Sequence, residues 1–343
     1  MKSKSGRILA LAVSLGLVLG ILPSQASAQY TLTKLTSNVS GQAKYTDPLL
    51  VNAWGLAYAP SEPFWVSDEG SGWSTLYDGS GDPQSLQVIV PSATGQGSGT
   101  PTGLAYNGSQ EFAIDGWPSV FLFATFDGTI QGWSDFDPST TLIAINNSKS
   151  NASYTGIGVT AHSSGNFLYA ADANNGVVDI YDGNFTFVKS FTDPKVPKGF
   201  APFNVEDING QVYVTFAATN GGPGGYVDIF SESGTLVKRL IHGKPLNQPW
   251  GLAMAPKNFG PLSNTLLVGN DNNLTATISG FNPTTGAYVG TITNSKGKSL
   301  KFDQLWAIEF GGGSSANGKT NALYFTAGPN NGADGLFGMI NFK

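Results

Sequence analysis

The 343-residue sequence contains no cysteine, and its 18 Lys and Arg are outnumbered by 23 Asp and Glu. This composition excludes disulfides, thiol catalysis and a thiolate zinc site, and it offers no basic patch of the kind on which nucleic-acid binding relies. The 45 glycines and the charged fraction of 12% are typical of a turn-rich β protein and not of a helical one.

The first 28 residues have the pattern of a secretory signal peptide. A basic start, an apolar run and a small-x-small cleavage sequence follow one another: Lys2, Lys4 and Arg7, then Ile8 to Leu22, then Ala26-Ser27-Ala28. The apolar run is shorter than the roughly 20 residues that a membrane span needs. We therefore expect cleavage after Ala28 and a secreted domain, extracellular or periplasmic, of residues 29–343. Its net charge is 15 − 23 = −8, and we expect a monomer without a membrane span.

Beyond this segment a short motif recurs six times. It combines a turn residue, an aromatic residue or Thr, a glycine and an apolar pair: Ala53-Trp54-Gly55-Leu56-Ala57, Pro101-Thr102-Gly103-Leu104-Ala105, Tyr154-Thr155-Gly156-Ile157-Gly158, Pro202-Phe203-Asn204-Val205, Pro249-Trp250-Gly251-Leu252-Ala253 and Leu305-Trp306-Ala307-Ile308. The copies lie 47 to 56 residues apart when these residues are taken as equivalent: Gly55, Gly103, Gly156, Phe203, Gly251 and Ala307. A period near 50 residues is that of a four-stranded propeller blade.

Strand patterns separated by polar turns follow each copy of the motif. The sixth copy ends at Phe342 without a fourth strand, whereas an orphan strand pattern, Tyr30 to Thr36, precedes the first copy. We expect this orphan strand to complete the last blade and close the ring, which protects the sheet edges. The sequence thus predicts one all-β domain, a six-bladed β-propeller. A β-sandwich and a β-helix are the alternatives, and the six long units favour the ring.

The repeats resemble a known family. Trp54-Gly55-Leu56-Ala57, Trp65-Val66-Ser67-Asp68 and Leu76-Tyr77-Asp78-Gly79 resemble NHL-type repeats. From Leu32 to Phe342 the chain resembles uncharacterised secreted bacterial proteins, some of which carry a C-terminal PEP-type sorting signal. The match is carried by residues 46–57, 200–204, 249–253 and 325–329. The resemblance implies an NHL-like propeller and no established activity. This chain departs from it by ending at Lys343 without that signal, which implies release and not retention.

In a propeller, the loops before the innermost strands and those joining the second and third strands share one face. Loops on a rigid scaffold often carry recognition, so we expect a site at this mouth of the channel. Its candidate residues are Asn52, Trp54, Asp68, Glu69, Thr102, Asp127, Thr155, Asp172, Asn204, Trp250, Asn270, Asp271 and Trp306. The aromatic rings would suit sugars or apolar side chains, although packing between blades is the favoured interpretation for them.

The carboxylates at this mouth suggest a second chemistry. Related propellers that hydrolyse lactones hold a divalent cation with Glu, Asn and Asp, and clustered oxygen ligands suit such a cation. Here every ligand would come from a different blade, and turns use Asp and Asn for their own hydrogen bonds. We therefore predict no cofactor, with a divalent cation such as Ca²⁺ as the alternative, and the adjacent pair Asp68 and Glu69 as the first residues to test.

Nucleophilic catalysis is disfavoured, because the two histidines, His162 and His242, are predicted loop residues without a Gly-x-Ser-x-Gly sequence nearby. The leading hypothesis is a non-enzymatic extracellular binding module for a glycan, a peptide or a surface protein. The alternative is a metal-dependent hydrolase or lyase of the lactonase type at the channel mouth, and a structural matrix protein is the third. The fold does not choose among them.

Overall fold

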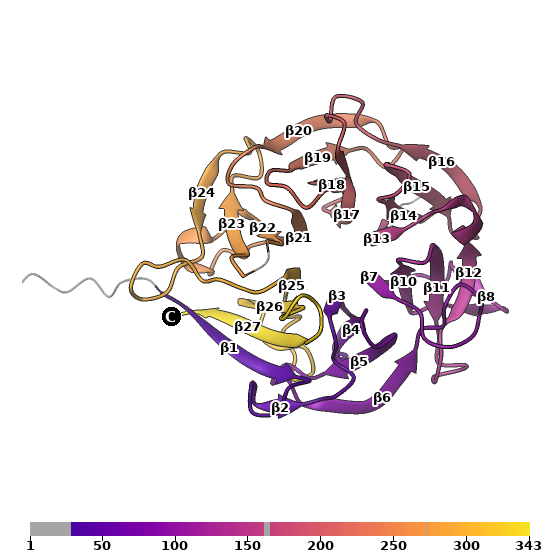
Figure 1. Cartoon of the computed structure of the whole chain (residues 1–343), viewed down its shortest axis with the longest axis horizontal. Helices are drawn as coiled ribbons and strands as arrows, with labels where there is room; N and C mark the ends of the chain where they lie inside the picture. Colours follow the sequence, from indigo (N-terminus) through magenta and orange to yellow (C-terminus); the bar gives the residue numbers. More distant parts are fainter. Residues whose placement is uncertain (1–28, 161–164, 273) are drawn as a thin grey trace, which may run out of the picture.

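The computed structural model describes residues 29–160, 165–272 and 274–343. They form six sheets of four or five strands arranged in a ring around a central axis (Figure 1). Each of these sheets is one blade, and neighbouring strands within a blade are antiparallel, except for a short edge strand of the sixth blade that pairs parallel. The strands of the first three blades, from the axis outward, are β3 (Ala53–Tyr58), β4 (Phe64–Asp68), β5 (Trp73–Tyr77) and β6 (Pro83–Ile89); β7 (Pro101–Tyr106), β10 (Phe121–Thr125), β11 (Thr129–Trp133) and β12 (Leu142–Asn146); β13 (Tyr154–Thr160), β14 (Phe167–Asp172), β15 (Val177–Asp182) and β16 (Phe187–Phe191).

The remaining blades repeat this order. The fourth and fifth consist of β17 (Phe200–Ile208), β18 (Gln211–Ala218), β19 (Tyr226–Phe230) and β20 (Leu236–His242); β21 (Pro249–Met254), β22 (Leu266–Asn270), β23 (Thr277–Phe281) and β24 (Tyr288–Thr291). The sixth consists of β25 (Leu305–Phe310), β26 (Ala322–Ala327), β27 (Leu336–Phe342), β1 (Tyr30–Ser37) and the short β2 (Tyr45–Thr46). A small hairpin and two short 3-10 helices lie in loops: β8 (Ala113–Ile114), β9 (Trp117–Pro118), η1 (Ser148–Ser150) and η2 (Gly260–Leu262).

The N-terminal strand β1 lies beside the C-terminal strand β27, as Figure 1 shows. The two strands pair antiparallel from Tyr30 opposite Phe342 to Ser37 opposite Leu336. The Tyr30 hydroxyl donates a hydrogen bond to the carbonyl oxygen of Phe259 at 2.7 Å, which ties β1 to the fifth blade as well. The two ends of the described chain therefore build one blade together.

The hydrophobic core is divided among the interfaces between blades. Most clusters combine residues from two neighbouring blades; one of them joins Leu122 of β10 to Ile157 of β13 and Leu168 of β14. The cluster that contains the tryptophans at the axis joins three blades. Strands buried on both faces explain why the second strand of each repeat reads as a continuous apolar run, because blades pack face to face. Burial of these faces is the main source of stability in a chain without disulfides.

The glycine of the repeated motif permits close approach of the innermost strands. A Cβ atom at Gly55 would lie 2.5 Å from the carbonyl oxygen of Thr102, and one at Gly251 would lie 2.5 Å from that of Trp306. A Cβ at Gly156 would lie 2.6 Å from the Cα of Asn204. In the fourth blade Asn204 therefore occupies the glycine position. The sequence alignment placed Phe203 there, which was wrong by one residue; Phe203 takes the position of the tryptophans.

Some sequence predictions lie outside the described residues: the signal peptide of residues 1–28 and His162. Within residues 29–160, 165–272 and 274–343, no helix is long and apolar enough to cross a membrane.

Candidate functional site

Three tryptophans fill one half of the central channel. Trp54 and Trp306 stack with their ring centroids 3.6 Å apart, and Trp250 packs edge-on against both at 6.4 Å. All three side chains are buried, with exposed fractions of 3 to 4%. We call this cluster the tryptophan plug. Its ring faces contact one another across the axis, so they are closed to a ligand.

Hydrogen bonds hold two of these indoles in place. The Nε1–H of Trp250 donates to the carbonyl oxygen of Thr155 at 3.0 Å, and that of Trp306 donates to Oδ1 of Asn52 at 3.1 Å. Asn52 in turn donates from Nδ2 to Oε2 of Glu69 at 2.7 Å. The structure thus brings together several predicted residues, and it gives Asn52 and Glu69 the role of orienting Trp306.

The residue two positions before each tryptophan has a left-handed backbone conformation. Asn52, Gln248 and Gln304 have φ values of +47°, +52° and +48°. This region is uncommon outside glycine, and Asn enters it more readily than most residues. The kink sets the direction in which each innermost strand enters the channel, and with it the direction of the indole.

The predicted carboxylates do not converge. Asp68 is fully buried inside the first blade, where Thr75 donates to its Oδ2 at 2.7 Å. Burial raises the pKa of Asp68 well above its usual range, and its Oδ1 has no hydrogen-bond partner among the described residues. Tyr77, which bonds Asp47 at 2.9 Å, completes this internal network. Asp68 therefore belongs to the interior of a blade and does not face the channel mouth with Glu69.

The other predicted polar residues form hydrogen bonds within the scaffold, some inside their own blade and some to the next blade. Asp127 accepts from the Ala93 N–H, and Asp172 accepts from the N–H groups of Ser153 and Asn175. Thr102 and Thr155 donate from their hydroxyls to the carbonyl oxygens of Tyr154 and Ala171, and Asn204 donates to that of Trp250. Asn270 accepts a hydrogen bond from the N–H of Asn247. These bonds satisfy turns and link neighbouring blades.

Asp271 is the predicted carboxylate with the fewest partners. Burial, reinforced by the nearby Asp303, raises its pKa to about 7, and its Oδ1 is unpaired among the described residues. Both oxygens of Asp303 accept backbone N–H groups, from Leu274 and Asn330. Within the described part of the chain, no group of three His, Cys, Asp or Glu residues is arranged to hold a metal ion. A calcium site at this mouth stays a prediction.

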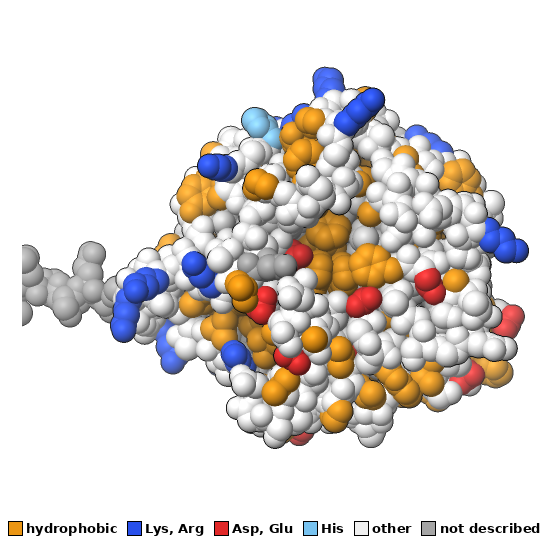
Figure 2. Space-filling model, in the orientation of Figure 1, with side chains coloured by type: hydrophobic (Ala, Val, Ile, Leu, Met, Phe, Trp, Pro, Cys, Tyr) orange, Lys and Arg blue, Asp and Glu red, His pale blue; other side chains and the backbone are white. Residues whose placement is uncertain are grey.

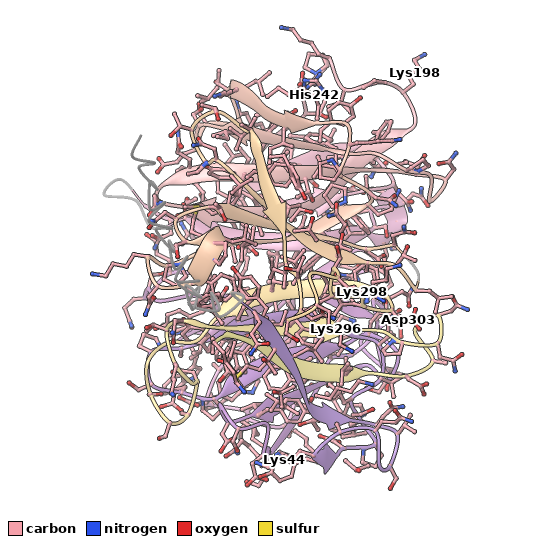
Figure 3. All side chains as sticks on the ribbon, turned by 90° about the vertical axis from the view of Figure 1, so that its left-hand side faces the viewer. Lys44, Lys198, His242, Lys296, Lys298 and Asp303 are labelled. Atoms are coloured by element: carbon pink, nitrogen blue, oxygen red, sulfur yellow. The ribbon has the colours of Figure 1, made fainter. Side chains whose placement is uncertain are left out.

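The loops before the innermost strands lie on one face of the disc, which we call the tryptophan face. In the edge-on view of Figure 3, Lys198, before β17, and Asp303, before β25, lie toward the same side, and His242 lies at the rim. Figure 2 shows hydrophobic side chains gathered at the centre of the ring and Lys and Arg side chains near its periphery.

A pocket of about 320 Å³ opens beside the plug. Its aromatic members are Phe126, edge-on against Trp54 at 4.7 Å, and Phe203, edge-on against Trp306 at 6.1 Å. Both rings are half-buried. The rest of the described lining is uncharged: Ser153, Thr155, Ala173, Asn174, Ala201, Pro202, Ala217, Ala218, Thr219, Gly221 and Gln248. We call it the phenylalanine pocket. Phe203 belongs to the fourth copy of the sequence motif, whereas sequence reasoning missed Phe126, which follows a strand in a turn outside the motif.

The other half of the channel contains a second cavity, of about 330 Å³. Tyr58, Tyr106, Glu206, Asp207 and Glu309 contribute its polar and aromatic lining. We call it the acidic hollow. Sequence reasoning missed it. The available signal was the residue two positions after the glycine of the motif, which is Ala or Gly in four blades and glutamate in two.

The sequence has viral relatives. No protein-family model matches the chain. An uncharacterised protein of Acanthamoeba polyphaga mimivirus is 29% identical over 338 residues, covering 93% of this chain and 82% of that protein. A second mimivirus protein is 27% identical, covering 93% of this chain and 87% of that protein. A third is 33% identical but covers only 50% of this chain and 35% of that protein. These relatives are viral, whereas the resemblance drawn from the sequence was to bacterial proteins.

Solved structures share the architecture at low identity. Virginiamycin B lyase from Staphylococcus aureus has a TM-score of 0.54 at 11% identity, covering 91% of this chain and 99% of that one. A luciferin-regenerating enzyme scores 0.53 at 12% identity, covering 91% and 95%. A streptogramin B lyase scores 0.52 at 12% identity, covering 93% and 100%. Likeness at this level concerns the fold alone, and it agrees with the six sheets described above: the chain is an all-β, six-bladed β-propeller.

Proposed function

We propose that this propeller is a secreted, non-enzymatic binding module that holds a neutral sugar residue of a glycan in the phenylalanine pocket. The observation that carries the proposal is the lining of that pocket, which combines two half-buried phenyl rings with hydroxyl and amide groups and no charge. Sites for small ligands are typically apolar with a few polar groups that fix orientation. An apolar C–H face of a sugar ring fits the phenyl surfaces, and its hydroxyls fit the rim.

The polar members of the pocket favour a sugar over an apolar peptide side chain. Ser153, Thr155, Asn174, Thr219 and Gln248 all border the cavity. Asn174, Thr219 and Gln248 donate to backbone carbonyls, but their side-chain oxygens accept no hydrogen bond from the described residues. The hydroxyls of a sugar therefore find acceptors here that an apolar side chain would leave unused. A charged sugar would lack a counter-ion, because no Lys or Arg is among the described lining residues.

Binding is favoured over metal-dependent hydrolysis by the geometry of the mouth. Asp127 and Asp172 are committed to backbone N–H groups of turns, and Asp68 lies inside a blade. A hydrolytic site needs such oxygens to converge on one point. Export is part of the proposal and rests on the signal-peptide pattern; the N-terminal sequence of exported protein should begin at Gln29.

The test is a glycan array with neutral and acidic sugars, run beside a peptide library. We expect neutral glycans to bind, and Phe126→Ala and Phe203→Ala to weaken binding at least tenfold. Phe187→Ala is the matched control, because Phe187 is 56% exposed on the outer strand β16 and should leave binding within twofold. Binding of peptides instead of glycans, or equal affinity of all three variants, would contradict the proposal.

A further inference from the structure

The acidic hollow lies on the side of the channel opposite the phenylalanine pocket. Its described lining comes from the innermost strands of five blades: Leu56, Ala57, Tyr58, Leu104, Ala105, Tyr106, Gly158, Val159, Glu206, Asp207 and Glu309, together with Pro60. A narrow extension of about 10 Å³ reaches from Glu206 and Glu309 to Asn204 and Trp250. The tryptophan plug therefore forms the bottom of the hollow, and the two cavities are separate sites.

The two glutamates occupy the same position of their blades. Glu206 stands opposite Tyr213 of β18 and Glu309 opposite Tyr324 of β26, just as Ala57 stands opposite Trp65 of β4. The remaining blades have small residues here: Ala105, Gly158 and Ala253. Small side chains at four positions leave the space open, and the two carboxylates border it from the fourth and sixth blades.

The hollow gathers carboxyl groups, and its described lining residues include no compensating cation. Burial and the neighbouring Glu309 raise the pKa of Glu206 to about 8, and burial raises the pKa of Glu309 to about 7. No Lys, Arg or His is among the described residues that line the cavity. The two carboxyl groups are half-buried and close enough for Glu309 to raise the pKa of Glu206. When ionised they repel each other, and a positive group between them would relieve the repulsion.

The aromatic lining and the size of the hollow favour an organic cation over a metal ion. Burial, together with the nearby Glu309 carboxylate, raises the pKa of the Tyr58 phenol to about 12. Tyrosine rings attract ammonium and guanidinium groups through cation–π interactions. No group of three acidic or histidine ligands is present in the described chain to surround a metal, and about 330 Å³ accommodates a whole side chain.

We propose that the acidic hollow is a second binding site, which takes an organic cation on an aliphatic stem, with the charged head between Glu206 and Glu309 and the stem beside Tyr58 and Tyr106. The ligand chemistry is that of a lysine side chain or a free diamine. This site is independent of the phenylalanine pocket.

Isothermal titration of the whole protein at pH 8.5 tests the proposal with three probes. Nα-acetyl-lysine methylamide represents a peptide side chain, putrescine represents a free diamine, and Nα-acetyl-norleucine methylamide is the neutral analogue. We expect at least one amine to bind, at least tenfold more tightly than the norleucine compound. Tighter binding of the lysine compound would identify a peptide side chain as the ligand, and tighter binding of putrescine would identify a free diamine. Equal binding of the norleucine compound, or no binding of either amine at 10 mM, on the order of the weakest affinities worth measuring, would overturn the proposal.

Variants connect the binding to the named carboxylates. Glu206→Gln and Glu309→Gln should each weaken amine binding at least tenfold, whereas Glu62→Gln should leave it within twofold. Glu62 is exposed in the loop after β3, on the same side of the disc but outside the hollow, so it controls for the loss of one charge. Phe203→Ala should have no effect here, which separates this proposal from the glycan proposal. An equal loss in Glu62→Gln would refute the assignment.

The affinity should also depend on pH. Glu206, Glu309 and Asp207 are the carboxyl groups facing the cavity, and Tyr58 and Tyr106 are its phenols. Because the carboxylates must be ionised to hold a cation, binding of the lysine probe should strengthen about tenfold from pH 6 to pH 8.5 in the wild type. The increase should vanish in a Glu206→Gln, Glu309→Gln double variant, and a persistent increase there would contradict the role of the pair.

Discussion

At the scale of single residues, the three indoles of the tryptophan plug differ in one hydrogen bond. Trp306 donates to Asn52, whereas Nε1 of Trp54 is buried and has no partner among the described residues. The two rings are otherwise comparable, because they stack on each other with similar burial. The pair therefore separates the effect of ring packing from the effect of the indole N–H.

Replacing each indole by phenylalanine measures this difference. Both changes remove similar volume, but only Trp306→Phe leaves the Oδ1 of Asn52 without its donor. We expect Trp306→Phe to be less stable than Trp54→Phe by roughly 1–2 kcal/mol, the usual cost of an unpaired buried acceptor. Urea denaturation of both variants measures the difference. Equal losses would mean that the Asn52 bond contributes nothing.

The pH dependence of stability also originates in single residues. Glu206 and Glu309 have pKa values raised to about 8 and about 7 from an ordinary 4.5. A carboxyl group whose pKa is higher in the folded state than in the unfolded state contributes stability at low pH, and loses it as the pH rises. The loss should begin near pH 4.5, where the unfolded chain ionises, and be complete above pH 8.

We therefore expect the free energy of unfolding to fall on the order of 3 kcal/mol more in the wild type than in the Glu206→Gln, Glu309→Gln double variant between pH 4.5 and 8.5. The comparison with the variant is needed because Asp228 and Asp271, with pKa values raised to about 7, shift stability in the same direction. Urea denaturation across this range gives the two curves. Parallel curves would show that the pair does not resist ionisation.

At the scale of elements, β1 decides whether the sixth blade is complete. Leu35 is 3% exposed in the cluster between the sixth and first blades, whereas its neighbour Lys34 faces solvent. An unpaired β27 would leave a strand edge open to another chain. The stability of the ring should therefore depend on the inward residues of β1 and not on the outward ones.

Leu35→Ala and Lys34→Ala form a matched pair within this strand. We expect Leu35→Ala to cost about 2–5 kcal/mol, as a buried leucine truncation does, and Lys34→Ala to stay within about 0.5 kcal/mol, as exposed changes do. Chemical denaturation of the whole protein provides both values. An unchanged free energy of unfolding in Leu35→Ala would mean that β1 does not pack against its neighbours.

At the scale of the whole molecule, the ring brings distant residues together. The plug joins the first, fifth and sixth blades, and the acidic hollow joins Glu206 of the fourth blade to Glu309 of the sixth. Each cavity ends at the plug, so the propeller has two separate cavities and not one continuous channel. A ligand on one face need not compete with a ligand on the other.

The sequence by itself determined the number of blades, the order of strands within each blade and the strand pattern ahead of the first motif. These features are local in the sequence. Each repeat of about 50 residues contains its own motif, which permits close approach of the innermost strand, and its own apolar runs, which predict the strands. Alignment of the motif failed only in the fourth blade, where Asn204 replaces the glycine and shifts the apparent register by one residue.

Only the tertiary structure decided which side chains meet at the axis. Closure of the ring stacks Trp54 on Trp306, leaves Phe126 and Phe203 partly open, and buries Asp68 inside a blade away from Glu69. It also places Glu206 and Glu309 around one cavity. Residues of non-adjacent blades meet only when the ring is closed, so no spacing along the chain encodes the distance between them. The burial that raises the pKa values of the carboxyl groups arises at the same step.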